Sequence, residues 1–314
     1  MSHSLSPRAT ANGRWLIVAA AVLWSLSGLF TRILQRPTSL GLHEPALTAF
    51  QLAFFRAFFA GLVLVPLIRR SEIRFRPLMP FMVASFASMN ALFVTAMFSG
   101  PAANAILLQN TAPFFVVLLS VFLFKEQLDR RSLLTLSVGM VGMLIIVLGG
   151  KQASNDETIR GGLDVTLMAV GSGLTYGLVI LCLRALRTES SEWLASLNLL
   201  GSAICLGTAI ALVHGITYWW NWITTPTITQ LLFLLAFGAI QMGLPYCLFA
   251  RGLRTVSPQE AGAITLLEPL LNPIWAYLIS PETDTPTPYT WIGGSLIFAA
   301  LVLRYFPRPA AKAK

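Results

Sequence analysis

Apolar residues in this chain gather into long blocks separated by short polar segments. The blocks are about 20 residues long, which lets a helix cross a hydrocarbon core roughly 30 Å thick. They lack the alternation of polar and apolar residues that is typical of half-buried strands. The pattern predicts ten helical spans, at Trp15–Leu34, Leu47–Ile68, Pro80–Phe98, Ala102–Phe124, Leu133–Leu148, Val165–Ala185, Trp193–Val213, Gln230–Ala250, Ala261–Ile279 and Trp291–Tyr305.

The composition indicates the solvent that surrounds these helices. Hydrophobic residues make up 55% of the 314 positions and charged residues 11%, and the mean hydropathy is +0.71. Soluble domains carry about 25% charged residues, so this chain has too few charges to cover a globular surface. Lipid offers the backbone no hydrogen bonds, and helices satisfy all of theirs internally. We therefore expect an all-α integral membrane protein, with the lipid bilayer as its main partner.

The basic residues indicate topology. The net charge is +9, but lysines and arginines lie in short loops and form no continuous stripe, which disfavours a nucleic-acid partner. Seventeen of them fall on the side that carries the N-terminus and four on the opposite side. Because basic loops favour the cytoplasm, we expect a multi-pass protein of the cell membrane with both termini cytoplasmic. The first block is expected to stay as a helix and not to be cleaved as a signal peptide.

A polar linker, Gly149–Gly162, divides the ten spans into five and five. It predicts two five-helix repeats, over residues 1–150 and 151–314. An odd number of spans in each half forces the second half into the opposite orientation.

The two halves also match in sequence. Sliding the chain by 156 residues places Pro113 on Pro269 and Glu126 on Glu282 without a gap between them. The loop after the fourth span is basic, whereas its counterpart after the ninth is acidic, as expected if the two lie on opposite sides of the membrane. Inverted repeats with a site near the midplane are typical of secondary transporters.

The stretches AANAILLQNTAPFFVVLLSVFLFKE (102–126) and AGAITLLEPLLNPIWAYL (261–278) resemble the ten-helix EamA type of the drug/metabolite transporter superfamily. LWSLSGLFTR (23–32) and Trp291–Gly293 extend the resemblance. The chain departs from the family at Ser280–Glu282, where members often carry a Gly-Glu pair. The resemblance implies an exporter or permease of amino acids, related metabolites or toxic organic compounds. It also implies a central cavity lined by spans one, three, four, six, eight and nine.

Two charged residues lie near mid-depth, Arg56 in the second span and Glu268 in the ninth. A charge inside a membrane is costly and marks either a functional group or a paired structural one. Glu268 is interpreted as a proton-coupling carboxylate or a partner for a cationic substrate group, or else as an acid fixed to an arginine. Arg56 is interpreted as a structural partner or as the site of a substrate carboxylate. The sequence leaves open whether the two residues pair.

Polar and aromatic residues in the other spans complete the candidate site. Thr265, Glu268 and Asn272 share one helical face. The amides and hydroxyls line a cavity or join helices by hydrogen bonds; the aromatic rings form cavity walls, cation–π platforms or packing contacts. The candidates for substrate binding or coupling are Trp24, Arg56, Asn90, Asn110, Thr111, Tyr176, Gln241, Tyr246, Thr265, Glu268 and Asn272.

These features predict a secondary transporter, an exporter of small metabolites that works by alternating access and is coupled to protons. The alternative is an uncoupled facilitator in which Arg56 and Glu268 form a fixed pair. The mixed polarity of the candidates is compatible with a zwitterionic, amino-acid-like substrate. The oligomeric state stays open.

Catalysis is disfavoured because the three histidines lie in or near loops and no span carries an HExxH motif or paired aspartates. No nucleotide-binding loop of the GxxxxGK[ST] type is present, which argues against ATP coupling within the chain. The three cysteines lie apart inside apolar blocks. We therefore expect no metal and no cofactor.

Overall fold

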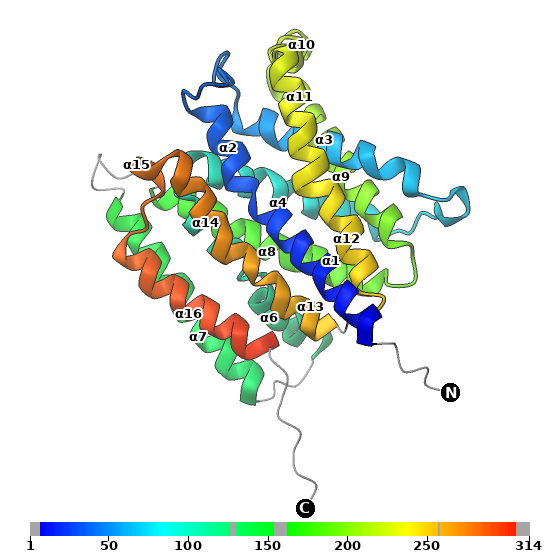
Figure 1. Cartoon of the computed structure of the whole chain (residues 1–314), viewed down its shortest axis with the longest axis vertical. Helices are drawn as coiled ribbons and strands as arrows, with labels where there is room; N and C mark the ends of the chain where they lie inside the picture. The colour runs from blue at the N-terminus through cyan, green and yellow to red at the C-terminus, as the bar shows by residue number, and fades with distance from the viewer. Residues whose placement is uncertain (1–6, 126–129, 154–161, 257, 306–314) are drawn as a thin grey trace, which may run out of the picture.

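The computed structural model describes residues 7–125, 130–153, 162–256 and 258–305, and every regular element in these ranges is helical (Figure 1). Nine helical stretches of the described residues are long and apolar enough to cross a membrane, and a tenth, Pro288–Arg304, is apolar but shorter. They coincide with the ten predicted spans, so the prediction of a ten-span all-α membrane fold is confirmed.

The second span ends in a short 3-10 helix, η1, and four other spans are divided into more than one helix within the apolar block. The first is α1 and α2, the fourth α5 and α6, the eighth α11, η3 and α12, and the ninth α13 and α14. The elements in chain order are α1 Pro7–Ser25, α2 Ser27–Gln35, α3 Ala49–Leu64, η1 Val65–Leu67, η2 Arg70–Glu72, α4 Met79–Ser99, α5 Ala102–Gln109, α6 Ala112–Phe124, α7 Arg130–Ala153, α8 Leu163–Ala185, α9 Ser191–His214, α10 Ile216–Thr224, α11 Ile228–Ala236, η3 Phe237–Gly243, α12 Leu244–Gly252, α13 Pro258–Thr265, α14 Leu267–Ile279, α15 Pro281–Asp284 and α16 Pro288–Tyr305.

The fifth span is longer than the apolar pattern predicts. Its helix, α7, begins at Arg130 and continues to Ala153, so residue 150, the predicted end of the first repeat, lies inside the helix. Lys151, Gln152 and Ala153 are good helix formers, which explains why the helix extends past the apolar block. The rest of the linker, residues 154–161, lies outside the described residues.

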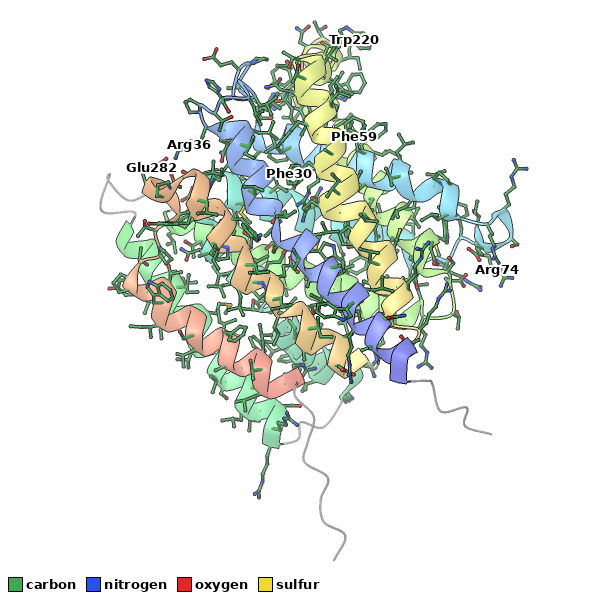
Figure 2. The ribbon with its side chains drawn as sticks, viewed as in Figure 1. Phe30, Arg36, Phe59, Arg74, Trp220 and Glu282 are labelled. Atoms are coloured by element: carbon green, nitrogen blue, oxygen red, sulfur yellow. The ribbon has the colours of Figure 1, made fainter. Side chains whose placement is uncertain are left out.

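A short helix, α10, follows the seventh span, and its nine residues are too few for the block pattern to predict a span. Gly215, with φ of 86°, turns the chain into it, a conformation that glycine adopts without steric penalty. Trp222 packs inward and its ring N–H donates to Thr48 Oγ1 at 3.3 Å. Trp220 is exposed at the tip of the molecule (Figure 2). Such a mixture of buried and exposed tryptophans suits a membrane interface.

Helix contacts between the two halves follow a two-fold pattern. The second span packs on the seventh (α3 on α9), and the fifth packs on the tenth (α7 on α16, side by side in Figure 1). The first span contacts the eighth and ninth, and the sixth correspondingly contacts the third and fourth. Exchanging each span with the one five places later leaves these pairings unchanged, as two inverted five-helix repeats require.

The α7–α16 pair crosses at two glycines. A Cβ atom on Gly142 would lie 2.6 Å from the carbonyl oxygen of Gly293, and one on Gly293 would lie 2.5 Å from that of Gly142. Any larger residue at either position would have to push two backbones apart. Small residues at close crossings are typical of helix pairs in membranes.

Spans four and nine are both interrupted near their middles. Asn110–Thr111 separates α5 from α6, and Leu266 separates α13 from α14. The first and second interruptions are related by the repeat offset of 156 residues. Pro113 and Pro269 follow them, and proline removes an N–H donor from the helical ladder.

Two further spans deviate from a regular α-helix. The first span is interrupted at Leu26, between Ser25 and Ser27. The eighth contains a π-helical stretch, Phe237–Gly243, directly before Pro245. Single π-turns are frequent at functional sites because they change the register of the side chains that follow. Four interrupted spans therefore meet in the interior of the bundle.

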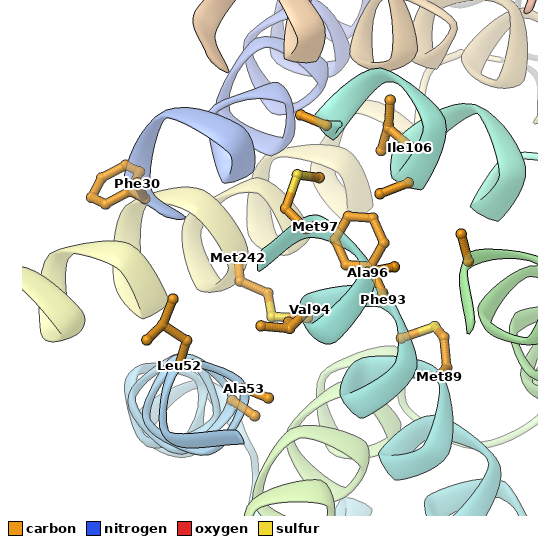
Figure 3. Close-up of a cluster of buried hydrophobic side chains, with 14 of the residues drawn as sticks. Phe30, Leu52, Ala53, Met89, Phe93, Val94, Ala96, Met97, Ile106 and Met242 are labelled. Carbon is orange, nitrogen blue, oxygen red and sulfur yellow. The ribbon is translucent and has the colours of Figure 1, made fainter. Parts of the chain in front are cut away.

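Buried apolar side chains from both halves fill the space between these spans (Figure 3). Phe30 and Leu52 come from the first two spans, Phe93 and Met97 from the third, and Met242 from the eighth. These side chains form one continuous cluster. Charged and polar groups inside it are shielded from bulk water, which strengthens their electrostatic interactions.

Candidate functional site

Arg56 lies in the middle of α3 and is only 3% exposed. Its Nη2 donates to Oδ1 of Asn90 at 2.6 Å, and its guanidinium carbon lies 5.7 Å from the ring centre of Phe93 and 5.6 Å from that of Phe237. Both distances are within the range of a cation–π contact. The Nε–H is buried and has no hydrogen-bond partner in the described part of the chain. The guanidinium is thus in contact with two aromatic rings and one amide.

Asn90, a predicted site residue on α4, is fully buried and supports the arginine. Its Oδ1 accepts from Arg56, while Nδ2 donates to the Ala53 carbonyl at 3.0 Å and to Ser202 Oγ at 3.2 Å. Both ends of the amide are therefore engaged by protein. Ser202 was not among the predicted residues, because a serine in a long apolar helix gives no sign of its distant partner.

Glu268 lies in the first turn of α14, directly after the interruption at Leu266, and is partly exposed. Among the described residues its carboxylate forms no ion pair within 4.0 Å, so Arg56 and Glu268 are not in direct contact. Arg56 and Glu268 nevertheless lie near enough to interact electrostatically, and Tyr246 interacts with both. In the described structure the two opposite charges therefore form no direct ion pair.

Trp24 and Tyr246 form an aromatic corner beside these charges. Their ring centres lie 5.5 Å apart at an interplanar angle of 78°, and Phe249 packs on Trp24 at 5.3 Å. Gln241, in the π-helical stretch, donates from Nε2 to the Trp24 carbonyl at 2.9 Å and leaves its own Oε1 without a partner in the described residues. The eighth span is thereby fixed to the interruption of the first.

Asn272 ties α14 to α2. It is fully buried, and its Nδ2 donates to Ser27 Oγ at 2.6 Å. Its Oδ1 has no hydrogen-bond partner in the described residues and lies against Gly28, where a Cβ would come within 2.8 Å of it. The residue thus holds the two helices at close range.

The remaining polar candidates bond to their own helices. Asn110 Nδ2 donates to the Ile106 carbonyl at 2.9 Å, Thr111 Oγ1 to that of Leu108 at 2.5 Å, and Thr265 Oγ1 to that of Gly262 at 2.9 Å. These carbonyls lie in the last turns before the two helix interruptions, and those of Ile106 and Leu108 also accept the backbone N–H groups of Asn110 and Thr111. Thr111 is buried, whereas Asn110 and Thr265 keep some exposure.

Tyr176 lies apart from this group. It is 37% exposed on α8, which packs against α4, α5, α6 and α7, whereas the ring contacts of Trp24 come from α12. The two aromatic residues occupy matching places in the two repeats, but only Trp24 joins Tyr246. A small cavity between α4, α5 and α8 is lined by Gly100, Asn104 and Thr166 among others, and none of its lining residues is a predicted site residue.

Comparison with known proteins agrees with this architecture. A solved crystal structure superimposes with a TM-score of 0.58 and 17% sequence identity over 94% of this chain and 97% of that one, which shows a common fold. An uncharacterized transporter of Archaeoglobus fulgidus is 27% identical over 93% of this chain and 96% of its own length.

Two relatives carry more specific names. An S-adenosylmethionine/S-adenosylhomocysteine transporter of Chlamydia trachomatis is 28% identical over 74% of this chain and 73% of its own length. The pseudopaline exporter of Pseudomonas aeruginosa is 25% identical over 82% of this chain and 86% of its own length. Residues 11–148 and 165–306 each match the EamA-like transporter family. The chain is therefore a multi-pass membrane protein that belongs to the EamA-like transporter family.

Proposed function

We propose that this transporter carries a small solute with both a carboxylate and a cationic group, and that it binds between Arg56 and Glu268. The observation that carries the proposal is the arrangement of two opposite charges inside the bundle, buried Arg56 on α3 and partly exposed Glu268 at the interruption of the ninth span, without direct contact between them. The carboxylate of such a solute would pair with Arg56, and its cationic group would pair with Glu268.

Arg56 is the proposed partner of the carboxylate. It has a buried Nε–H without a partner in the described residues and one side-chain hydrogen bond through Nη2. Arginine binds carboxylates with two parallel N–H donors, and such bonds are strong where water is excluded. The Asn90 amide and the rings of Phe93 and Phe237 fix the guanidinium plane in advance.

Glu268 is the proposed partner of the cationic group, with Trp24 and Tyr246 beside it. An aromatic corner next to a carboxylate favours an ammonium or a similar cation through its ring faces. The relatives named for S-adenosylmethionine and pseudopaline make amino-acid-like solutes the first class to test.

Glu268 is also the proposed coupling group. A carboxylate without an ion-pair partner in the described residues can accept a proton when the site opens to the acidic side and release it on the other side. An uncoupled facilitator would instead keep Glu268 in a permanent pair with Arg56, and the lack of a direct ion pair between the two side chains in the described residues favours coupling. We propose export as the direction, and a cell-membrane location with both termini in the cytoplasm.

The test is transport into proteoliposomes. The purified protein would be offered neutral amino acids, S-adenosylmethionine and simple organic cations, each with and without a pH gradient. We expect uptake of at least one zwitterion, driven by the gradient. Glu268→Gln should abolish the response to the gradient, and exchange at equal pH should show a raised KM, because the carboxylate that pairs with the cationic group is lost.

Glu282→Gln is the matched control, since Glu282 is an exposed carboxylate at the end of the bundle, 59% exposed in its side chain. It should respond to the gradient like the unchanged protein. Uptake of organic cations alone would contradict the carboxylate-binding role of Arg56. Gradient-driven uptake that persists in Glu268→Gln would exclude the coupling role of Glu268.

A further inference from the structure

A second buried charge pair closes one end of the bundle. Arg32, near the end of α2, and Asp284, the last residue of α15, have side chains that are 2% and 0% exposed. Arg32 Nε donates to Asp284 Oδ2 at 2.6 Å and Nη2 donates to Oδ1 at 2.8 Å. The pair is bidentate, the strongest geometry for an arginine and a carboxylate. It joins the first span of one repeat to the loop after the ninth span of the other.

Backbone groups of two more segments complete the arrangement. The remaining guanidinium N–H groups reach the Met97 carbonyl at 2.9 Å and the Gly100 carbonyl at 2.6 Å, both at the end of the third span. Asp284 Oδ1 also accepts the backbone N–H of Ala102, the first residue of α5, at 2.7 Å. The ends of spans one, three, four and nine are thus tied at one point, and three of these spans line the candidate site.

A more exposed pair lies on the outer side of this point. Arg36 contacts Glu282 at 2.9 Å, and it also donates to Ser280 Oγ at 3.1 Å and to Thr283. Figure 2 shows Arg36 and Glu282 together at the end of the molecule where α2 and α15 meet. We call this end, defined by Arg32, Arg36, Glu282 and Asp284, the latch end.

The opposite end of the bundle, where α1 begins and α16 ends, is built differently (Figure 1). Two ion pairs across the repeats lie at this end: Arg14 with Glu260 at 2.5 Å, with side chains that are 54% and 36% exposed, and Arg76 with Glu189 at 2.7 Å, with side chains that are 50% and 4% exposed. Arg184, which the repeat alignment places on Arg32, is exposed. Each of these pairs therefore has at least one exposed side chain, whereas both side chains of the Arg32–Asp284 pair are buried.

A buried ion pair is a poor way to gain stability alone, because desolvation offsets much of the attraction, and apolar residues would hold the helices as well. It is well suited to a contact that must open. Water solvates both charges once the helices part, which lowers the free energy of the open state relative to that of an exposed apolar pair. A contact that is strong when buried, and whose charges are hydrated when it breaks, allows both a closed and an open state.

We propose that Arg32 and Asp284 form the latch that seals the latch end of the substrate site, and that it breaks each time the site opens to that side. The inference rests on the proposed alternating-access function. The present structure is the state closed at the latch end.

The test measures access to the site from the latch end. Cys182, Cys205 and Cys247 are first replaced by alanine. Thr265→Cys then reports on the site, and Glu44→Cys, in the exposed loop between α2 and α3, identifies the vesicle face that carries the latch end. A membrane-impermeant thiol reagent is added to that face of the full-length protein in vesicles.

We expect slow labelling of Thr265→Cys in the protein in which Arg32 and Asp284 are both present. Asp284→Asn should raise the rate by about tenfold or more, which corresponds to about 1.4 kcal/mol. Glu282→Gln removes a carboxylate two residues away from an exposed pair and should change the rate by less than about twofold. Equal rates for Asp284→Asn and the unchanged protein, with Glu44→Cys labelled normally, would overturn the proposal.

Loss of a buried charge can also prevent folding, so Arg32→Lys provides a second test. Lysine keeps the positive charge but cannot form the bidentate bond, and the labelling rate should rise to an intermediate value. An unchanged rate in a monodisperse Arg32→Lys preparation would count against the latch.

The outcomes also separate the latch from the proposed solute. Faster labelling of Asp284→Asn in a protein that moves none of the zwitterions would support the latch and reject the solute class. Zwitterion transport by the unchanged protein, combined with unchanged labelling of both latch variants, would support the solute class and reject the latch.

Discussion

Two buried arginines in the first half of this chain differ in how well they are neutralised. Arg32 is matched by a bidentate carboxylate and by backbone carbonyls. Arg56 has one amide partner, two aromatic rings and an Nε–H with no partner in the described residues. A buried charge that is left incompletely paired is unfavourable unless something else completes it. The contrast supports the proposals that Arg32 holds the latch end closed and that Arg56 binds the solute.

Asn90→Asp should test that assignment. A carboxylate at this position would accept from Arg56 at the same place and neutralise it. Its second oxygen would lose the bond to the Ala53 carbonyl and face that oxygen instead, so the melting temperature of the variant is measured alongside its transport. Transport of carboxylate-bearing solutes should fall at least about tenfold, because the arginine then has a permanent partner. The measurement is uptake of zwitterions by the purified variant in proteoliposomes.

Ser202→Ala is the comparison for that experiment. It removes the hydroxyl that Asn90 Nδ2 contacts at 3.2 Å and leaves every charge in place, so transport should change only modestly. Zwitterion uptake at the unchanged rate by Asn90→Asp would show that Arg56 does not bind the carboxylate.

Sequence reasoning singled out the charged residues of the proposed site but not the partners that the structure gives to the buried charges. Arg56 and Glu268 stand out because charge is rare inside apolar blocks. Asp284 could not be recognised as a partner of Arg32, because 252 residues separate them and the acid lies in a polar loop. The supporting role of Ser202 was equally hidden. Such pairings depend on how distant helices pack, which no local pattern records.

At the scale of the helices, the interrupted spans and the close helix crossing contribute different features to the structure. The interruptions at Asn110–Thr111 and Leu266 place polar groups at mid-depth in both repeats. The α7–α16 crossing at Gly142 and Gly293 brings two backbones together, away from the charged residues. Spans five and ten therefore form a rigid pair, beside which the interrupted spans can move.

Gly142→Ala is expected to destabilise the protein although alanine is the better helix former. The added methyl would meet the Gly293 carbonyl oxygen at 2.6 Å, a backbone atom that cannot move alone. Overpacking of this kind costs about 1–3 kcal/mol, which exceeds the gain in helix propensity of up to about 1 kcal/mol. The loss of stability is measured as a lower melting temperature of the detergent-solubilised variant.

Gly171→Ala is the matched control within a span. Its Cβ would meet only a Leu92 methyl group, at 3.3 Å, and a leucine side chain can shift. This variant should melt at or above the temperature of the unchanged protein. Equal melting temperatures for the two variants would mean that the α7–α16 crossing is looser than described.

The elements differ in how far the sequence predicts them. All ten spans follow from hydropathy, and Pro113 and Pro269 signal two of the interruptions. The interruption at Leu26 has no proline, and Gly243 with Pro245 indicates a bend in the eighth span but not its π-helical form. Both depend on contacts between the first, eighth and ninth spans, such as the bond from Gln241 to the Trp24 carbonyl. Tertiary packing decides such details.

For the whole molecule, the proposed orientation follows from counting basic residues, and it can be tested without knowing the solute. With the three native cysteines replaced, Ser154→Cys in the central linker should react with an impermeant thiol reagent added to intact cells. Ser71→Cys, in the basic loop between the second and third spans, should react only after the membrane is opened. The reverse result would invert the topology and place the latch end in the cytoplasm.

Because the Arg32–Asp284 pair is buried, its strength should respond less to the salt content of the surrounding solution than that of exposed ion pairs. Dissolved ions screen charges in water over about 8 Å at physiological ionic strength, but they barely reach a pair that no water contacts. The Arg14–Glu260 pair at the other end lies in solution and is open to that screening. The Arg36–Glu282 pair at the latch end is also partly exposed and open to screening, so the buried Arg32–Asp284 pair should be the one that keeps its strength as salt rises. In the proposed orientation the latch end faces outward, so the carrier would stay closed to the outside over a wide range of external salt concentrations.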